Sequence, residues 1–279
     1  MILGSLFGFG DGGATPSADV DFLPTDDARS WLAESLGELA ARLDAPASTP
    51  RWLTVPPVEK PTDLDALFEH ICVVQTEVGQ RDVEFALVDS TEGPPPPGFS
   101  PLGDPQGQLM HTFARGDELA IMVTPALFRV AAKLPALVHA SVARELGRIA
   151  IHRVGGHLDH RDDIGAEDME AEAELAAILL GMGIWIANGA YVYENKCCGG
   201  GCGVDLRSLR AGLSLPEACF ALALDGRRRG LSPKLATKHL ESTQKAAFKA
   251  AVSCVARTPD LLALVSALPA AALGSSRGG

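Results

Sequence analysis

Apolar residues recur at helical spacing along most of the chain. In residues 27–44, Trp31, Leu32, Leu36 and Leu39 lie near one side of a helical wheel, which predicts an amphipathic helix. A second helix is predicted to begin at Thr62, with apolar positions through residue 72. From residue 124 onward the pattern is almost entirely helical, and it predicts helices over 135–153, 167–192, 214–229, 233–256 and 259–271.

Strand patterns are confined to the first half of the chain. Val83, Phe85 and Leu87 alternate with polar residues, which predicts a strand over 82–89. Residues 109–123 predict a hairpin that turns at residues 115–117. Four consecutive prolines within 91–107 indicate a loop without regular structure, because proline lacks a backbone donor and has a fixed φ.

Proline, glycine and serine mark where several of the helices begin and end. Pro125 and Pro135 each stand where a helix can begin, and the glycine pair at 155–156 ends the helix over 135–153. Ser214 and Glu217 form a capping box around Pro216 at the start of a later helix.

The composition indicates a folded α+β protein. The chain has 279 residues, of which 47% are hydrophobic, enough for a sizeable core. We expect a small N-terminal part with a few strands packed on a mainly helical core. The predicted organisation is a helix and linker region at 1–60, a main domain at 61–256, and a C-terminal helix with a frayed tail at 257–279.

Charge and cysteine content narrow the classes of function. The formal net charge of −11 argues against bulk nucleic-acid binding, which requires positive potential. Six cysteines are too few for a disulfide scaffold in a chain of this length, and the first residues lack the basic region of a secretory signal, so we expect a cytoplasmic protein. No phosphate-binding glycine loop is evident, and we expect no cofactor.

One apolar stretch has the length of a membrane span. Residues 175–193 carry no charged side chain, but Gly181, Gly183, Asn188 and Gly189 interrupt them. A helix that is apolar on all sides occurs both in membranes and in protein cores. We expect a buried central helix here and no membrane span.

The helix over 135–153 carries a charged face with a distinctive spacing. Arg144, Glu145, Arg148 and His152 share one side of the wheel, together with Ser141. The segment Arg144-Glu145-Leu146-Gly147-Arg148 has the frame of a zinc-binding H-E-x-x-H helix, with arginine at both histidine positions. Glu170 and Glu174 follow at i, i+4 spacing on the next predicted helix.

Three segments together resemble a family of bacterial zincin-like proteins, most without an assigned function. The matching segments, in the order and spacing of that family, are ARELGR at 143–148, LGMGIWIANG at 180–189 and LSLPEACFALAL at 213–224. The resemblance covers about residues 60–255 and implies a gluzincin-type metallopeptidase fold. It assigns Glu145 as the general base, Glu170 as the third metal ligand and Glu174 as the acidic residue that orients a ligand.

Arginine at positions 144 and 148 departs from the family at its metal site. A guanidinium group stays protonated and offers no lone pair, so neither residue can ligate zinc. We therefore expect no metal and no zincin hydrolysis, and a vestigial Glu145. Two arrangements remain open: Arg144 and Arg148 pair with Glu145, Glu170 and Glu174 in a buried cluster, or the arginines are solvated on an exposed face.

Two other groups of residues are candidates for a displaced metal site. The histidines His152, His157 and His160 lie near several aspartates, although such a loop is also typical of a hydrated helix end. Three cysteines, Cys197, Cys198 and Cys202, offer part of a zinc spacing but no second half, unless Cys219 completes it.

The leading hypothesis is therefore an inactive, metallopeptidase-like protein that acts by binding a protein or peptide partner. The partner would lie along the 118–123 strand by strand addition. The alternatives are an active metalloenzyme with a displaced site, and a structural module that forms homo-oligomers. Residues 157–174 carry eight acids and one base, whereas 227–257 carry eight bases and one acid, an asymmetry that suits oligomerisation but is also typical of solvated faces.

Overall fold

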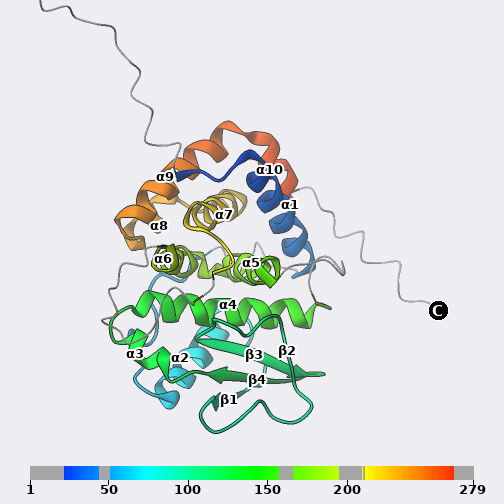
Figure 1. Ribbon diagram of the computed structural model, residues 1–279. Helices are drawn as coiled ribbons and strands as arrows, with labels where there is room; N and C mark the ends of the chain where they lie inside the picture. The colour runs from blue at the N-terminus through cyan, green and yellow to red at the C-terminus, as the bar shows by residue number, and fades with distance from the viewer. Residues whose placement is uncertain (1–21, 44–50, 157–165, 195–208, 210, 267–279) are drawn as a thin grey trace, which may run out of the picture.

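A small mixed sheet lies at one end of a stack of helices in the computed structural model (Figure 1). The structure describes residues 22–43, 51–156, 166–194, 209 and 211–266. The α+β class predicted from the sequence is confirmed. The boundaries predicted at residues 60 and 256 stay predictions.

The sheet has the strand order β1-β4-β3-β2. Its strands are β1 (Ala86–Asp89), β2 (Ser100–Pro101), β3 (Met110–Arg115) and β4 (Glu118–Val123). β1 is parallel to β4, and the hairpin partners β3 and β4 are antiparallel, as are β2 and β3. The hairpin turns at Gly116, whose φ of 61° places it in the left-handed region that glycine readily adopts.

Three sequence predictions about the strands were wrong in detail. The strand predicted over 82–89 forms only from Ala86, since Val83 N–H bonds back to Gln80 in a turn. The proline-rich segment 91–107 contains the short strand β2. The strand 118–123 is β4, which has neighbours on both sides and therefore has no free edge for an added peptide strand.

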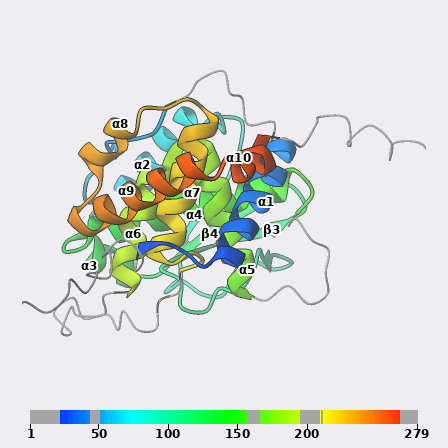
Figure 2. The same ribbon diagram turned by 90° about the horizontal axis from the view of Figure 1, so that it is seen from above.

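Helix α1 and helices α4 to α10 form layers above the sheet, with α9 and α10 at the top, whereas α2 and α3 lie at the level of the sheet (Figure 1). α7 packs on both α9 and α6, and the view from above shows α9 and α10 across the top of the molecule (Figure 2). The bounds are α1 (Asp26–Arg42), α2 (Leu64–Glu77), α3 (Ala126–Ala131), α4 (Pro135–Arg153), α5 (Ala166–Ala177), α6 (Gly183–Glu194), α7 (Leu215–Arg228), α8 (Pro233–His239), α9 (Ser242–Arg257) and α10 (Pro259–Ser266).

Most of the predicted helix ends agree with the structure. α4 begins at Pro135, and the capping box of Ser214 and Glu217 starts α7. The cap of α2 is Asp63 rather than Thr62, because the Asp63 carboxylate accepts the Ala66 N–H while the Thr62 hydroxyl donates to Asp63. The single helix predicted over 233–256 is divided into α8 and α9, with extended backbone at the intervening residues 240–241.

The predicted helix over 167–192 is interrupted in its middle. A π-helical turn, Ile178–Met182, separates α5 from α6, and Gly181 within it has φ 97°. A side chain at Gly181 would meet the Arg51 carbonyl oxygen at 2.8 Å, and the Gly181 carbonyl accepts the Leu53 N–H. The close approach of the 51–53 segment thus requires glycine at this position.

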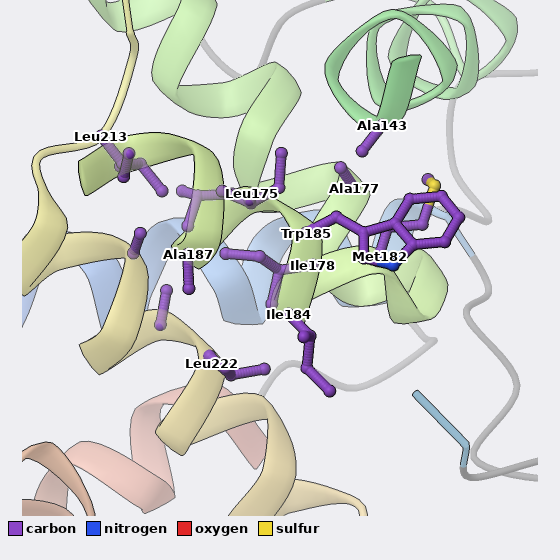
Figure 3. Packing of buried hydrophobic residues seen from close by; sticks show 14 of the residues in the cluster. Ala143, Leu175, Ala177, Ile178, Met182, Ile184, Trp185, Ala187, Leu213 and Leu222 are labelled. Carbon is purple, nitrogen blue, oxygen red and sulfur yellow. The ribbon is translucent and has the colours of Figure 1, made fainter. Parts of the chain in front are cut away.

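The central helices bury the apolar stretch. The segment Met169–Ala190 is long and apolar enough to cross a membrane, and 89% of its most apolar window is buried among the other elements, as predicted for a core helix. Leu175, Ile178, Ile184 and Leu222 are among the side chains that fill the space between α5, the π-helical turn, α6 and α7 (Figure 3). Gly147 lets α4 approach α5 closely, because a Cβ there would lie 2.0 Å from the Ala173 carbonyl oxygen.

Two buried histidines lie together under the 58–59 segment. The rings of His70 on α2 and His139 on α4 lie 5.0 Å apart and both pack near Trp185. His70 Nδ1 accepts the Val58 N–H, so the ring is bound in its neutral form. Burial, together with the His139 charge, lowers the pKa of His70 to about 3, and burial lowers that of His139 to about 4 despite its bond to Glu59 O.

These lowered pKa values predict an acid-sensitive fold. The unfolded chain, with ordinary histidine pKa values near 6.5, takes up protons before the folded chain does. The stabilisation is therefore complete above pH 6.5 and is lost as the pH falls toward 4. Between pH 7 and 5 the free energy of unfolding is expected to fall by about 2 kcal/mol per histidine, measured by urea denaturation.

The His139→Phe variant tests the source of this effect. It should remove about 2 kcal/mol of the pH-dependent change, whatever its stability at pH 7. His239→Gln, at a half-buried position on α8, is the control and should keep all of it. An unchanged pH slope in His139→Phe would contradict the assignment.

Candidate functional site

The charged residues predicted from the H-E-x-x-H frame form one buried cluster between α4 and α5. We define the Arg/Glu cluster as Arg144, Glu145 and Arg148 of α4 with Glu170 and Glu174 of α5. Each of these residues is 2% exposed or less. The prediction of a buried cluster is therefore confirmed, and the alternative of arginines on an exposed face was wrong. α4 is buried on all sides from Leu137 to Ile151.

Arg144 bonds to Glu174 of α5 and to the side chain of Gln108, which lies just before β3. Its Nε lies 2.8 Å and its Nη2 2.6 Å from Glu174 Oε1, and its Nη1 donates to Gln108 Oε1. Glu174 also accepts the backbone N–H groups of Gly212 and Leu213, at 3.2 and 2.7 Å. Glu174 therefore joins α5 both to α4 and to the segment that leads into α7.

Arg148 links Glu145 and Glu170 across the helix interface. Its Nε lies 3.1 Å from Glu145 Oε2, its Nη2 lies 2.7 Å from Glu170 Oε2, and its Nη1 donates to the Leu102 carbonyl at 2.7 Å. Glu170 Oε2 is also 3.7 Å from Arg144 Nε. Both guanidinium groups thus converge on Glu170, the position that the resemblance assigns as third metal ligand.

Glu145 is bound from the sheet as well as from Arg148. The Thr112 N–H and hydroxyl both donate to Glu145 Oε2 at 2.8 Å. Burial alone would raise the pKa of Glu145, but the charges of Arg148 and His111 and the bonds from Arg148 and Thr112 hold it below its ordinary value. Burial would likewise lower the pKa of Arg148, but Glu145 and Glu170 raise it above its ordinary value. These interactions favour the ionised forms of both side chains.

The cluster is closed toward the sheet by residues 102–108. The Leu102 N–H donates to Thr112 O, so this segment continues the pairing of β2 along the outer side of β3. Gly103, with φ 103°, lies against Arg148, because a Cβ there would be 2.8 Å from Arg148 Nη1. This segment, which includes Gln108, covers the cluster through its bonds to Arg144 and Arg148.

These covering residues were missed by sequence reasoning. Thr112 lies on the inward side of a strand, and Gln108 is a polar residue beside an apolar run. Nothing in the sequence around either residue indicates a bond to a charged side chain on α4. His111 was also missed. It is 3% exposed, neither of its ring nitrogens has a partner among the described residues, and burial lowers its pKa although Glu145 opposes that shift.

The candidates for a displaced metal site are not assembled within the described residues. His152 Nε2 lies 3.0 Å from the Gly116 carbonyl at the hairpin turn. Cys219 is buried and its thiol contacts Gln244 O of α9 at 3.6 Å. The remaining candidates lie outside the described residues: His157, His160, Cys197, Cys198 and Cys202. Within the described part, no group of three or more His, Cys, Asp or Glu side chains could hold a metal ion.

The acidic stretch that ends at residue 174 is partly interior. Glu170, Glu172 and Glu174 are 1%, 5% and 2% exposed, so for these three the expectation of a solvated face was wrong. The hydrogen bonds of Glu170 and Glu174 are what allow their charges to be buried.

No protein-family model, curated protein or solved structure matches this chain.

The burial of the cluster predicts a large cost for removing one partner. Glu174→Ala would leave Arg144 without its shortest ion pair and two backbone N–H groups without their acceptor. We expect it to lower the free energy of unfolding by about 3–5 kcal/mol, measured by urea denaturation.

A matched exposed ion pair provides the control. Glu118→Ala removes the partner of Arg115, where both side chains are more than half exposed, and should cost no more than about 1 kcal/mol. Equal costs for the two variants would show that the cluster is not the interlocked network described.

Proposed function

We propose that this chain is a catalytically inactive, metallopeptidase-like protein of the cytoplasm that acts by binding. The observation that supports this is the state of the Arg/Glu cluster. Every residue that would have to bind metal or activate water is ion-paired to another member of the cluster and closed off from solvent. A general base and a third ligand without the other components do not make a hydrolytic site.

The zinc that the family resemblance implies does not fit the residues present. Arg144 and Arg148 occupy the two histidine positions and offer no lone pair. A catalytic zinc also needs an open coordination position for water or substrate. Here the Leu102 carbonyl, the Gln108 amide and the Thr112 hydroxyl fill the surroundings of the cluster. We therefore derive no metal-dependent step for this chain.

The cluster is better suited to a structural role. It bonds α4 to α5, α4 to β3 and to the 102–108 segment, and α5 to residues 212–213. These bonds support a structural role for the cluster, which holds the helices and the sheet together. In this proposal the binding surface lies elsewhere on the protein. The unknown protein or peptide partner would therefore contact another part of the scaffold, and β4 is not that surface.

Metal analysis of the purified, untagged protein tests the proposal. We expect less than about 0.1 zinc or other transition metal ion per chain, and no change in Tm on adding zinc or EDTA. Peptidase activity on unfolded casein should be absent. About one bound metal per chain would instead support an active enzyme with a displaced site.

A double variant tests whether the metal frame is otherwise retained. Arg144→His/Arg148→His places two imidazoles beside Glu170, where both guanidinium groups now converge. We expect this variant to bind about one zinc ion per chain with a rise in Tm on zinc addition. The matched control, Arg144→Met/Arg148→Met, removes the same charges without adding ligands and should bind none. Equal zinc content in the two variants would count against the resemblance to a zinc site.

A further inference from the structure

A cavity of about 560 Å³ lies where the C-terminal ends of α1, α2 and α4 meet the π-helical turn. This volume is in the range that small-molecule sites occupy. The cavity contacts Ala150 and Arg153 in the last turn of α4 and Val154 just after it, on the C-terminal side of the Arg/Glu cluster. Gln80 on its wall donates to the Leu146 carbonyl at 3.0 Å, which anchors the wall to α4.

The cavity has an apolar wall that the rest of the core leaves uncovered. Leu43, Leu53, Val78, Val154 and Leu180 line it and are only half-buried, although each packs against the hydrophobic core or borders it. Leu180 is the partly exposed leucine of the otherwise buried π-helical turn. The wall therefore offers apolar surface that a ligand would remove from water.

The wall is held in shape by an irregular piece of helix. π-helical turns are rare and occur frequently at functional sites. This one is fixed by the Leu53–Gly181 backbone bond and by Arg229, which donates to the carbonyl oxygens of Ile178 and Leu179. A preformed wall reduces the ordering that ligand binding must cost.

Guanidinium groups outnumber carboxylates among the residues that line the cavity, because Asp82 and Asp225, the partners of Arg153 and Arg229, lie outside the lining. Three arginines, Arg51, Arg153 and Arg229, line the cavity against one carboxylate, Glu77. Arg229 is occupied by the π-helical turn and Asp225. Arg51 and Arg153 are 58% and 45% exposed, and their pairs with Glu77 and Asp82 are open to solvent. Exposed pairs of this kind are weak, so both guanidinium groups can turn to a bound anion.

We propose that this cavity binds an amphipathic carboxylate, with its apolar chain against the leucine and valine wall and its carboxylate against Arg153 and Arg51. The forked guanidinium group of arginine matches a carboxylate in a bidentate contact. The two exposed guanidinium groups favour an anion over a cation, and the apolar wall favours an alkyl or aryl chain over a small polar acid. This inference rests on the proposed function, which is binding without hydrolysis. It names the class of ligand that such a protein would bind in this cavity.

Titration calorimetry with decanoate, octanoate, decyl phosphate and decyltrimethylammonium, all below their micelle concentrations, tests this proposal on the full chain. We expect one saturable decanoate site per chain. Each methylene contributes about 0.8 kcal/mol, so decanoate should bind about fifteenfold more tightly than octanoate. Decyltrimethylammonium should not bind. Tighter binding of decyl phosphate than of decanoate would overturn the choice of a carboxylate.

Two variants and a control locate the site. Arg153→Gln removes a charge-assisted contact and should weaken decanoate binding about tenfold. Arg115→Gln is the matched control, because Arg115 also forms an exposed ion pair, at the hairpin, and does not line the cavity; its affinity should be unchanged. Val154→Trp fills the cavity from a half-buried position just after α4 and should abolish binding.

The outcomes separate this proposal from the proposed function. No saturable binding, equal binding of the cationic amphiphile, or equal affinities for Arg153→Gln and Arg115→Gln would overturn the carboxylate site. None of these results changes the metal content of the protein, which is what tests the inactive Arg/Glu cluster. Conversely, a stoichiometric metal would overturn the proposed function and leave the ligand measurement standing.

Discussion

The charge network between α4 and α5 is the constraint on which the arrangement of the molecule depends. Three carboxylates and two guanidinium groups are removed from water, and such burial is costly unless every charge finds a partner. Arg144 and Arg148 each meet carboxylates together with an uncharged oxygen from the 102–108 segment. The positions of both helices, β3 and two connecting segments are therefore specified together.

This network requires that the backbones lie close enough for the short bonds to form. Gly147 and Gly212 make that possible, because a Cβ at either position would lie 2.0–2.2 Å from backbone atoms of α5. Gly147 stands between the charged residues of the α4 frame. The small residue is thus part of the same arrangement as the charges, since a larger one would separate the helices and stretch the ion pairs.

Local signals in the sequence predicted the elements, and the departures have physical causes. The α4 boundaries, the hairpin and the α7 capping box follow from proline, glycine and serine chemistry within a few residues. The π-helical turn does not, because its shape depends on the 51–53 segment, which is distant in sequence. The position of β4 in the centre of the sheet depends on β1 joining it from outside the hairpin, which periodicity along one strand cannot reveal.

The same distinction holds for the site. Helical geometry placed Arg144, Glu145 and Arg148 on one face, and the family resemblance linked that face to Glu170 and Glu174 on the next helix; the structure brings all five together. Leu102, Gln108 and Thr112 could not be found in this way. They meet the cluster only through tertiary packing of an irregular segment, and Leu102 contributes its backbone rather than its side chain.

A metal centre and an ion-pair network can hold the same elements together, yet they differ in what they leave open. A catalytic metal keeps one coordination position for water or substrate. In the Arg/Glu cluster both guanidinium groups are bonded to carboxylates, and the residues around them fill the space that a substrate would need. In the proposed function, the cluster keeps the spacing of a hydrolytic site and serves stability in place of chemistry. Accessible apolar surface with solvent-exposed ion pairs occurs instead at the C-terminal end of α4, which is where the proposed ligand site lies.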